Sequence, residues 1–472
     1  MKKLLLILVP VLANLEVVWA APPLLQLSPA KRLLTEPAAV VVSRVPPGAE
    51  VTIEATLTDR GGRAWSSRGV FYADVRGIVD VAEAASLGGT YHGLDAEGLF
   101  WSMLPVGTGE LEQFTAADRL AHDWPWVPDF DSWNADFALR RNPVAITVRA
   151  YVTGALGTEP PEYAVATQQV AFIGPGVKEI PVAEGTLRGV LFEPPGEGPF
   201  PVAMIVTGSG GGAYDGKAAL LASRGIAALA LAHFNYEGRP AQLLNMPLEY
   251  FRDAMRWLGE RYGQERVAIF GDSRGGEGVL LIASYFPEQV SAVVAGVPSN
   301  MVFAGCCTEN LEPAPAWTLK GEPLPYVPWR LNTLRASQLW PGSSEARDIY
   351  LSAMTAHNFA DPRWIPVENI RAPLLLVSGE ADAIWPSNIA AERVIERLKA
   401  KNHAYPYEHI EYPGAGHAVT FPMLVKSLAD RMTSAAFGGL AIGGTPRGNA
   451  FAQTDAFQRI VDFILLHEGA EN

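Results

Sequence analysis

Five continuous apolar runs, separated by amphipathic segments, constrain the fold of the second half of this chain more than any other feature. A run without polar alternation is typical of a parallel strand that is buried on both faces of a sheet. The intervening segments 247–263 and 388–401 have apolar residues on one helical face and charges on the other. This alternation predicts a doubly wound, mostly parallel α/β sheet. The runs are residues 201–208, 225–234, 267–271, 290–298 and 372–379.

The sequence before this region follows a different period. Residues 51–59, 63–74 and 143–154 alternate apolar and polar side chains, with glycine- and proline-rich turns between such runs. Short alternating strands of this kind predict an immunoglobulin-like antiparallel β-sandwich. A length of 472 residues fits two domains. We therefore expect a sandwich domain over 21–175 and an α/β catalytic domain over 176–472.

The N-terminal residues 1–20 have the pattern of a secretory signal peptide. Two lysines precede the apolar run 4–13, and a small-residue cleavage site follows at 18–20. The alternative is a buried or membrane-anchoring first helix, but Pro10 and Glu16 interrupt the segment well before the roughly 20 residues that a bilayer span needs. We expect an exported protein (periplasmic or secreted) with no stable membrane span after cleavage.

Composition and missing motifs exclude several classes of function. The net charge is −13, and no cluster of basic residues follows the N-terminus, so nucleic acid and anionic membranes are not expected partners. The two cysteines, Cys306 and Cys307, are adjacent and cannot form a disulfide framework. They are either two thiols in a loop or a strained vicinal disulfide. Zinc-protease and dinucleotide-binding motifs are absent, so the sequence implies no metal or cofactor.

One serine lies between glycines at the junction of an apolar run and an amphipathic segment. Residues 271–275 read GDSRG, which fits G-x-S-x-G with a strand before it and a helix after it. In α/β-hydrolase folds this turn exposes the serine Oγ, and the following helix N-terminus can stabilise a developing negative charge. The alternative is an ordinary glycine-rich turn. The strand–helix context favours Ser273 as a nucleophile.

A serine nucleophile needs a base and an orienting acid, which follow it in this fold in the order acid, then histidine. Asp382 follows the apolar run 372–379, and Glu380 is a weaker candidate for the same role. His417 lies in a glycine-rich loop after the next expected strand, where a general base would stand. The competing histidines fall in the sandwich, before the acid, or inside a helix or strand. They are His92, His122, His233, His357, His403, His409 and His467.

An oxyanion hole needs two backbone N–H donors. One is expected from Arg274, directly after the nucleophile, and the other from Gly210 or Gly211 in the glycine-rich loop 206–216. The segment from Gly211 to Lys217 also fits G-x-x-x-x-G-K. A phosphate loop requires serine or threonine at the next position, which is alanine here. The oxyanion interpretation is therefore preferred.

Residues 299–360 interrupt the α/β alternation between the nucleophile helix and the acid. The segment contains several aromatic residues among prolines. We expect a cap that covers the site and lines an acyl or aromatic pocket, with Trp317, Tyr326 and, beyond the cap, Trp385 contacting the substrate. The alternative is a surface excursion without a role in the site.

The chain resembles the acyl-CoA thioesterase and bile acid-CoA:amino acid N-acyltransferase family. The segments that carry the resemblance are 27–65, 87–103, 230–240, 316–328 and 443–464. The resemblance implies a sandwich before an α/β-hydrolase domain, and a triad at Ser273, Asp382 and His417. Members with serine at the nucleophile position are mostly thioester hydrolases, whereas the amino acid conjugating branch has cysteine there.

The expected function is hydrolysis of an acyl thioester, such as an acyl-CoA of fatty acid metabolism, through an acyl-enzyme on Ser273. An exported carboxylesterase or peptidase-like hydrolase is the alternative enzyme, and a catalytically silent binding protein is the alternative outside enzymes. Asp272 and Arg274 place charges beside the nucleophile, where familiar thioesterases have mostly apolar or neutral residues. A difference in substrate is expected at these two positions. The sequence does not indicate the oligomeric state.

Overall fold

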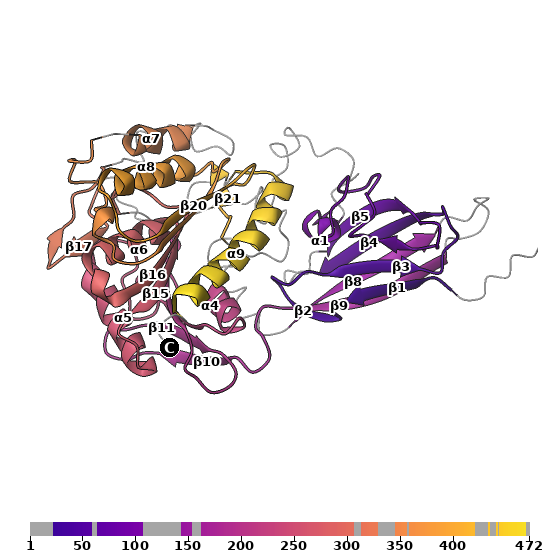
Figure 1. Cartoon of the computed structure of the whole chain (residues 1–472), viewed down its shortest axis with the longest axis horizontal. Coiled ribbons are helices and arrows are strands. Elements are labelled where there is room, and N and C mark those ends of the chain that lie inside the picture. Colours follow the sequence, from indigo (N-terminus) through magenta and orange to yellow (C-terminus); the bar gives the residue numbers. More distant parts are fainter. Residues whose placement is uncertain are drawn as a thin grey trace, which may run out of the picture.

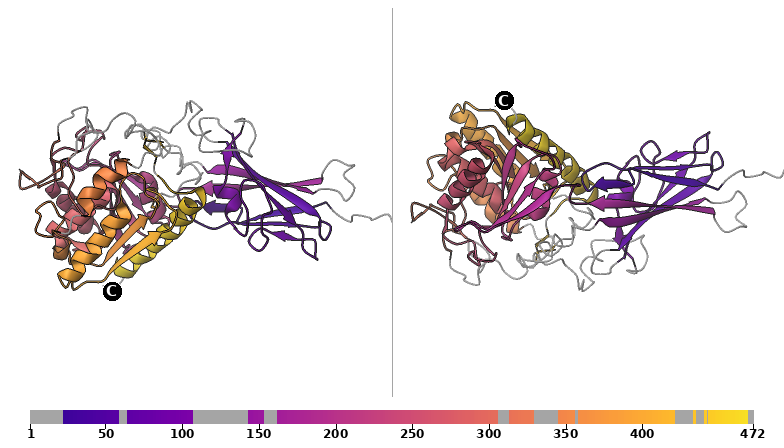
Figure 2. Two further views of the ribbon diagram at one scale, coloured as in Figure 1. Left: turned by 90° about the horizontal axis from the view of Figure 1, so that it is seen from above. Right: turned by 90° about the horizontal axis from the view of Figure 1, so that it is seen from below.

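The computed structural model shows an elongated molecule in which a β-rich part and a larger α/β part lie end to end (Figure 1). The two further views keep this separation, and helix α9 (Pro446–Glu468) lies at the junction in each of them (Figure 2). The structure describes residues 22–58, 64–106, 143–152, 162–305, 313–328, 345–355, 358–420, 433–434, 440–441 and 443–468.

The N-terminal part is built from two sheets, as the alternating pattern predicts. In strands β4 and β8 every second side chain is buried, because neighbouring residues of a strand point to opposite faces. The larger sheet has the order β2 (Lys31–Leu33), β9 (Glu162–Ala171), β8 (Val144–Val152), β4 (Glu50–Thr58), β5 (Ala64–Tyr72) and β7 (Leu104–Pro105). The smaller sheet has the order β1 (Leu24–Ser28), β3 (Ala39–Ser43) and β6 (Val79–Asp80). The short helix α1 (Gly98–Trp101) packs beside β5.

The α/β part contains one eight-stranded sheet. All five predicted apolar runs form its buried strands. Six neighbouring strands of this sheet, in the order β13, β12, β15, β16, β19 and β20, pair in parallel. The antiparallel pairs at one edge, β10 with β11 and β11 with β13, were not predicted. The order is β10 (Lys178–Val182), β11 (Gly189–Glu193), β13 (Ala227–Leu231), β12 (Val202–Val206), β15 (Val267–Asp272), β16 (Val290–Gly296), β19 (Leu374–Gly379) and β20 (Tyr407–Tyr412).

Helices cover both faces of this sheet, which is why its strands are apolar throughout. Helices α4 and α9 pack against one face, and α5, α6 and α8 against the other (Figure 1). The predicted C-terminal helix, 454–469, begins eight residues earlier than expected, with Pro446 in its first turn. The other helices are α4 (Asp215–Ala222), α5 (Leu248–Tyr262), α6 (Arg274–Tyr285), α8 (Ser387–Ala400) and the 3₁₀ helices η1 (Pro287–Gln289) and η4 (Val367–Asn369).

The segment expected to form a cap contributes helix α7 (Glu345–Met354) and part of a small sheet. That sheet has the order β14 (Met246–Pro247), β17 (Trp317–Leu319) and β18 (Glu322–Pro323), and a separate pair joins β21 (Thr433–Ser434) to β22 (Leu440–Ala441). In Figure 1, β17 lies at the end of the molecule opposite the sandwich. Cys306 and Cys307 fall outside the described residues, as does the expected signal peptide.

The two parts meet through polar contacts as well as apolar packing. Arg447, in the first turn of α9, lies 3.4 Å from the Asp95 carboxylate of the sandwich. The Gly174 N–H, between the two parts, donates to Ser223 Oγ at 2.7 Å. A helix with the length and hydropathy of a membrane span does not occur within the described residues.

Candidate active site

Ser273 occupies a strained turn between strand β15 and helix α6. Its φ of 56° and ψ of −120° lie outside the regions that a non-glycine residue ordinarily adopts. Such a conformation costs about 1–3 kcal/mol and persists only where the surroundings hold it. The Ser273 N–H donates to the Gly296 carbonyl oxygen at 2.9 Å, and this bond fixes the turn to the end of β16. The side chain of Ser273 therefore projects from the carboxyl edge of the parallel sheet.

The glycines of the G-x-S-x-G sequence are required by close backbone contacts. A Cβ on Gly271 would lie 2.2 Å from the Gly275 carbonyl oxygen, and one on Gly275 would lie 2.4 Å from the Val206 carbonyl oxygen. Neither site can hold a side chain unless strands β12 and β15 or helix α6 move. The sequence pattern thus has a steric cause in the packing of the turn.

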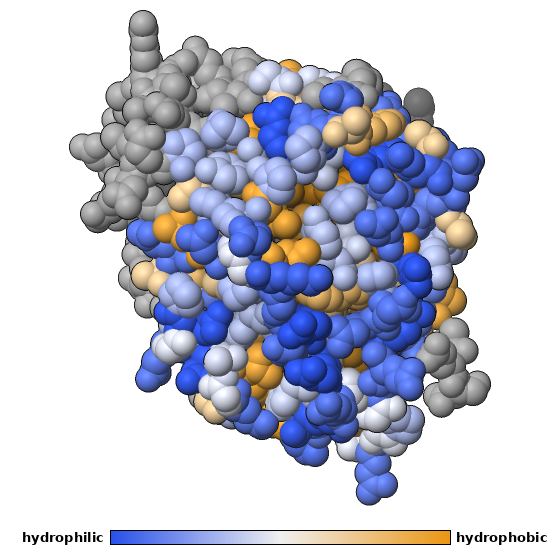
Figure 3. Space-filling model, turned by 90° about the vertical axis from the view of Figure 1, so that its left-hand side faces the viewer, coloured by the Kyte–Doolittle hydropathy of each residue, from blue (hydrophilic) through white to orange (hydrophobic). Residues whose placement is uncertain are grey.

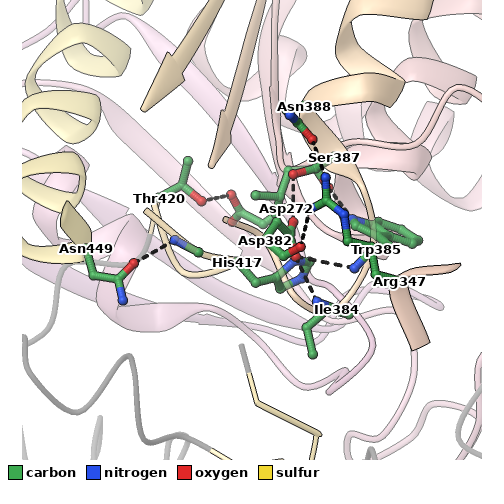
Figure 4. Close-up of polar contacts among 12 residues, drawn as sticks. Asp272, Arg347, Asp382, Ile384, Trp385, Ser387, Asn388, His417, Thr420 and Asn449 are labelled. Carbon is green, nitrogen blue, oxygen red and sulfur yellow. Dashed lines mark hydrogen bonds and ion pairs between the residues drawn. The ribbon is translucent and has the colours of Figure 1, made fainter. Parts of the chain in front are cut away.

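Asp382 and His417 lie side by side in the loops after β19 and β20 (Figure 4). His417 Nδ1 is 2.8 Å from Asp382 Oδ2, and the Asp382 side chain is completely buried. The other acidic candidate, Glu380, is exposed and accepts a hydrogen bond from the Gly414 N–H at 3.0 Å. The structure therefore brings Asp382 to His417, and it leaves Glu380 at the surface.

Neutral donors from its own loop hold the Asp382 carboxylate in place. Oδ1 accepts from the backbone N–H groups of Ile384, at 3.0 Å, and Trp385, at 3.3 Å, and Oδ2 accepts from Ser387 Oγ at 2.6 Å. Arg347 of α7 donates to the backbone oxygen of Asp382 at 2.5 Å, which attaches the cap segment to this loop (Figure 4). Asp382 can thus keep His417 Nδ1 protonated and leave Nε2 able to accept a proton.

Asn449 of α9 holds the histidine loop, and sequence reasoning missed it. Its buried Oδ1 accepts from the Gly416 N–H at 2.7 Å, and its Nδ2 donates to the Gly443 carbonyl oxygen at 3.2 Å (Figure 4). The residue before His417 is thereby tied to the C-terminal helix. The signal that could have indicated this contact is a polar residue in line, at helical spacing, with the buried apolar residues Ala452, Ala456 and Ile460.

The charge of Asp272, a position where we expected a difference in substrate, is compensated inside the protein. Asp272 is fully buried; Oδ2 pairs with the Lys217 ammonium of α4, and Oδ1 accepts from Thr420 Oγ1 of the histidine loop (Figure 4). Burial lowers the pKa of the Lys217 ammonium, whereas the Asp272 carboxylate acts in the opposite direction. Lys217 is therefore paired with a carboxylate of the protein, and this pairing explains its presence in the segment without a bound phosphate.

Arg274 is likewise neutralised within the protein. Its guanidinium lies 2.6 Å from Glu277 Oε2 and donates to the carbonyl oxygens of Phe303, at 3.1 Å, and Ala304, at 3.0 Å. Trp317 donates its indole N–H to Glu277 at 2.7 Å. Burial raises the pKa of the Glu277 carboxyl to about 7, and Arg274 and Trp317 act in the opposite direction. The charges at 272 and 274 are thus both compensated by partners within the protein, and the expected difference in substrate stays a prediction.

The glycine-rich loop lies directly against the nucleophile turn. The Cβ position of Gly208 is 3.4 Å from the Ser273 Cβ. The Gly211 N–H donates to the Gly208 carbonyl oxygen at 3.1 Å, which closes a turn within the loop. Gly210 is buried, and its carbonyl oxygen accepts from Asn235 Nδ2 at 3.0 Å. Of the two loop candidates for an oxyanion donor, Gly211 already uses its N–H, so Gly210 is favoured beside Arg274.

The three aromatic residues expected to bind substrate have different surroundings. Trp317 is completely buried in the core, where it supports α6 at Gly278. Tyr326 is half-buried, and its hydroxyl donates to the Pro313 carbonyl oxygen at 3.4 Å. Trp385 is also buried, at 2% exposure, and its ring meets His417 edge-on, with centroids 6.1 Å apart. Sequence position alone could not separate core aromatics from those beside the site.

Tyr326 lines a shallow hollow of about 660 Å³ together with Leu324, Asp361 and Arg363. An Asp361–Arg363 ion pair of 2.5 Å lies at this hollow. The end of the α/β part that faces away from the sandwich is mostly hydrophilic, with apolar side chains gathered toward its middle (Figure 3). The described residues include no group of three His, Cys, Asp or Glu side chains that could hold a metal ion.

Two family models match the chain. The "Acyl-CoA thioester hydrolase/BAAT N-terminal region" matches residues 35–122, and "BAAT / Acyl-CoA thioester hydrolase C terminal" matches residues 246–470. The first match covers much of the sandwich, and the second covers Ser273, Asp382 and His417.

Curated relatives match over nearly the whole chain. Acyl-coenzyme A thioesterase 1 of Rattus norvegicus is 30% identical over 95% of this chain and 97% of its own length. Acyl-coenzyme A thioesterase 2, mitochondrial, of Homo sapiens is 31% identical over 92% of this chain and 82% of its own length. Among solved structures, an esterase/lipase from an uncultured bacterium matches at 17% identity with a TM-score of 0.38, over 63% of this chain and 87% of that chain.

Proposed function

Because the chain belongs to the acyl-CoA thioester hydrolase/BAAT family, we propose that it hydrolyses acyl-CoA thioesters with Ser273 as the nucleophile. The observation that carries this proposal is the geometry of the carboxyl edge of the sheet. There, Ser273 stands at a strained strand–helix turn, and Asp382 and His417 are hydrogen-bonded in the loops of strands on one side of it. The family match, the order of the residues along the chain and this geometry support the same reaction.

In the proposed mechanism, Ser273 Oγ attacks the thioester carbonyl carbon while His417 Nε2 takes the hydroxyl proton. The negative charge that develops on the carbonyl oxygen is stabilised by the backbone N–H groups of Arg274 and Gly210. The C–S bond then breaks, and the leaving thiolate takes the proton from His417. A water molecule then gives a proton to His417 and attacks the acyl carbon. The bond to Ser273 Oγ breaks, His417 returns the proton to Oγ, and a carboxylic acid is released.

The buried state of Asp382 supports its role as the orienting acid. Three donors besides His417 bind its oxygens, so the carboxylate is held in one orientation beside the imidazole. Trp385, edge-on to His417, is proposed to border the acyl group.

The expected signal peptide favours a second candidate function. If the chain is exported, as we propose from residues 1–20, an exported ester or amide is a more accessible substrate than a coenzyme A thioester. The same triad would cleave it by the same acyl-enzyme route. The two candidates differ only in the leaving group.

A comparison of the protein with Ser273→Ala tests the proposal. Release of coenzyme A from acyl-CoAs of several chain lengths would be followed with a thiol reagent, beside hydrolysis of p-nitrophenyl esters and aminoacyl amides. We expect thioester turnover that falls by about 10⁴-fold or more in Ser273→Ala, since the nucleophile is lost. Equal turnover by both proteins would exclude Ser273.

The other outcomes separate the remaining candidates. Turnover of esters or amides without turnover of thioesters would replace the substrate and keep the mechanism. If a fluorophosphonate probe leaves Ser273 unlabelled and none of the substrates is cleaved, the protein is a binding module built on a hydrolase fold. A far-UV circular dichroism spectrum of each protein controls for folding.

A further inference from the structure

The Asp272 carboxylate connects three chain segments that each carry part of the candidate site. It belongs to the last residue of β15, directly before Ser273, and none of its surface is exposed. One oxygen pairs with Lys217, 55 residues earlier, and the other with Thr420, 148 residues later. Figure 4 shows the Thr420 hydroxyl directed at Asp272, in the loop that also carries His417.

Lys217 connects the carboxylate to the oxyanion loop. It lies in the first turn of α4, which begins just after the glycine-rich loop. In the same turn, the Tyr214 hydroxyl accepts the Gly208 N–H at 3.1 Å. The Lys217 side chain is buried, and its ammonium also lies 4.3 Å from the centroid of the Phe270 ring. Movement of α4 relative to β15 would therefore separate a buried charge from its partner, which is costly.

Thr420 connects the carboxylate to the base. It lies three residues after His417 and is completely buried. A Cβ on Gly296 would fall 2.2 Å from Asp272 Oδ1 and 3.0 Å from Thr420, so the end of β16 closes this space tightly. The hydroxyl can reach the carboxylate only when the histidine loop lies against β15 and β16.

We propose that Asp272 is a positioning residue, whose carboxylate sets the oxyanion loop through Lys217 and the His417 loop through Thr420 relative to Ser273. This inference rests on the proposed function, since it concerns the same site. Asp272 does not touch the substrate, because both its oxygens are occupied and it is buried. A displacement of about 1 Å between reacting groups can lower the rate by about 100-fold. A residue next to the nucleophile that fixes the positions of both loops therefore affects the rate.

Thr420→Val tests the link to the base with little change in side-chain shape. We expect kcat to fall by about 10- to 100-fold with KM within about twofold, because the base is displaced while the binding surface stays. Thr420→Ser, which keeps the hydroxyl, should recover most of the lost rate. Thr454→Val, which removes a hydroxyl from α9, is the matched control for a loss of threonine. A folded Thr420→Val protein with the kcat of the wild type would overturn the proposal.

The double variant Asp272→Asn/Lys217→Met removes both charges, so neither is left buried alone. Its labelling rate with a fluorophosphonate, measured per folded protein, should fall at least about tenfold, because the loop that supplies Gly210 loses its link to β15. The carboxamide oxygen can still accept from the Thr420 hydroxyl, so this variant tests the link to the oxyanion loop. Labelling at the wild-type rate would mean that the pair serves stability only, and it would overturn the proposal.

Fluorophosphonate labelling tests the positioning role of Asp272 independently of the proposed thioester substrate. Fluorophosphonate labelling needs an activated serine but no coenzyme A ester, so the inference can hold if the thioester proves wrong. If the wild-type protein is not labelled at all, the serine mechanism fails and the positioning role fails with it. If the wild type is labelled and Ser273→Ala is not, the variants report on Asp272 alone.

Discussion

Two buried aspartates stand at the carboxyl edge of the same sheet, and the protein holds them in opposite ways. Asp382 is bound by neutral donors within five residues of its own position, in addition to His417. Asp272 is bound by a cation and a hydroxyl from distant segments. Both carboxylates are completely buried. The difference lies in where the stabilising groups come from.

This difference shows how a buried carboxylate can be given a function. The carboxylate that its own loop holds shares Oδ2 between Ser387 and His417, and so it can respond to a proton transfer nearby. A carboxylate that is paired with Lys217 has its charge compensated, and it fixes the elements around it instead. Residue type and burial are the same, so the partners decide which role each aspartate has.

The largest expected effect is that of Asp382→Asn on turnover. The amide cannot support a protonated imidazole as the carboxylate does, so we expect kcat to fall by about 10⁴-fold with little loss of stability. Steady-state hydrolysis and thermal unfolding measure the two effects separately. Glu380→Gln, at the exposed alternative acid, is the matched control and should stay close to the wild-type rate. A Glu380→Gln variant that loses as much activity as Asp382→Asn would contradict the assignment.

The second effect concerns stability at Asp272. Asp272→Asn leaves the Lys217 ammonium buried without its counter-charge, and we expect the free energy of unfolding to fall by about 3–5 kcal/mol. Urea denaturation at neutral pH measures this loss. Adding Lys217→Met should recover most of it, because no unpaired charge remains. If the single variant is as stable as the double variant, the pair does not behave as a buried ion pair.

The third effect is smallest at neutral pH and concerns a buried group that is kept neutral. His233 packs against Phe251 and Trp317, and burial, reinforced by the charge of Arg239, lowers its pKa from 6.5 to about 3. Between these values only the unfolded chain takes up a proton at this histidine. The resulting contribution to stability is complete above about pH 6.5 and is lost as the pH falls toward 3, by at most about 1.4 kcal/mol per pH unit.

His233→Phe should therefore flatten the dependence of the free energy of unfolding on pH between about 6.5 and 4. Urea denaturation at several pH values, compared with the wild type, gives this difference in slope. Because burial causes the effect, a His92→Phe variant at an exposed position is the control. Equal slopes for the wild type and His233→Phe would show that His233 is protonated to the same extent in the folded and unfolded states.

Much of the fold could be predicted because its signals are local. Each apolar run of the α/β part and the alternating strands β4, β5 and β8 can be recognised within about ten residues. The early start of α9 was missed because Asn449 in its first turn contacts the histidine loop, which is distant in sequence. The antiparallel edge β10–β11 is close in sequence, and it was missed because its short strands lack the continuous apolar pattern of the other runs. The burial of Trp317 could not be predicted, because an aromatic residue has the same local pattern in a core and in a pocket.

The sequence by itself determined the residue types and the order of the candidate site. The glycines around Ser273, and the loops that place Asp382 and His417 after successive strands, can be identified because backbone sterics and chain order are properties of short segments. Only the tertiary structure decided what the charges beside Ser273 do. Asp272 contacts Lys217 and Thr420, which are 55 and 148 residues away in the sequence. Because Asp272 is buried away from water, its charge is paired within the protein.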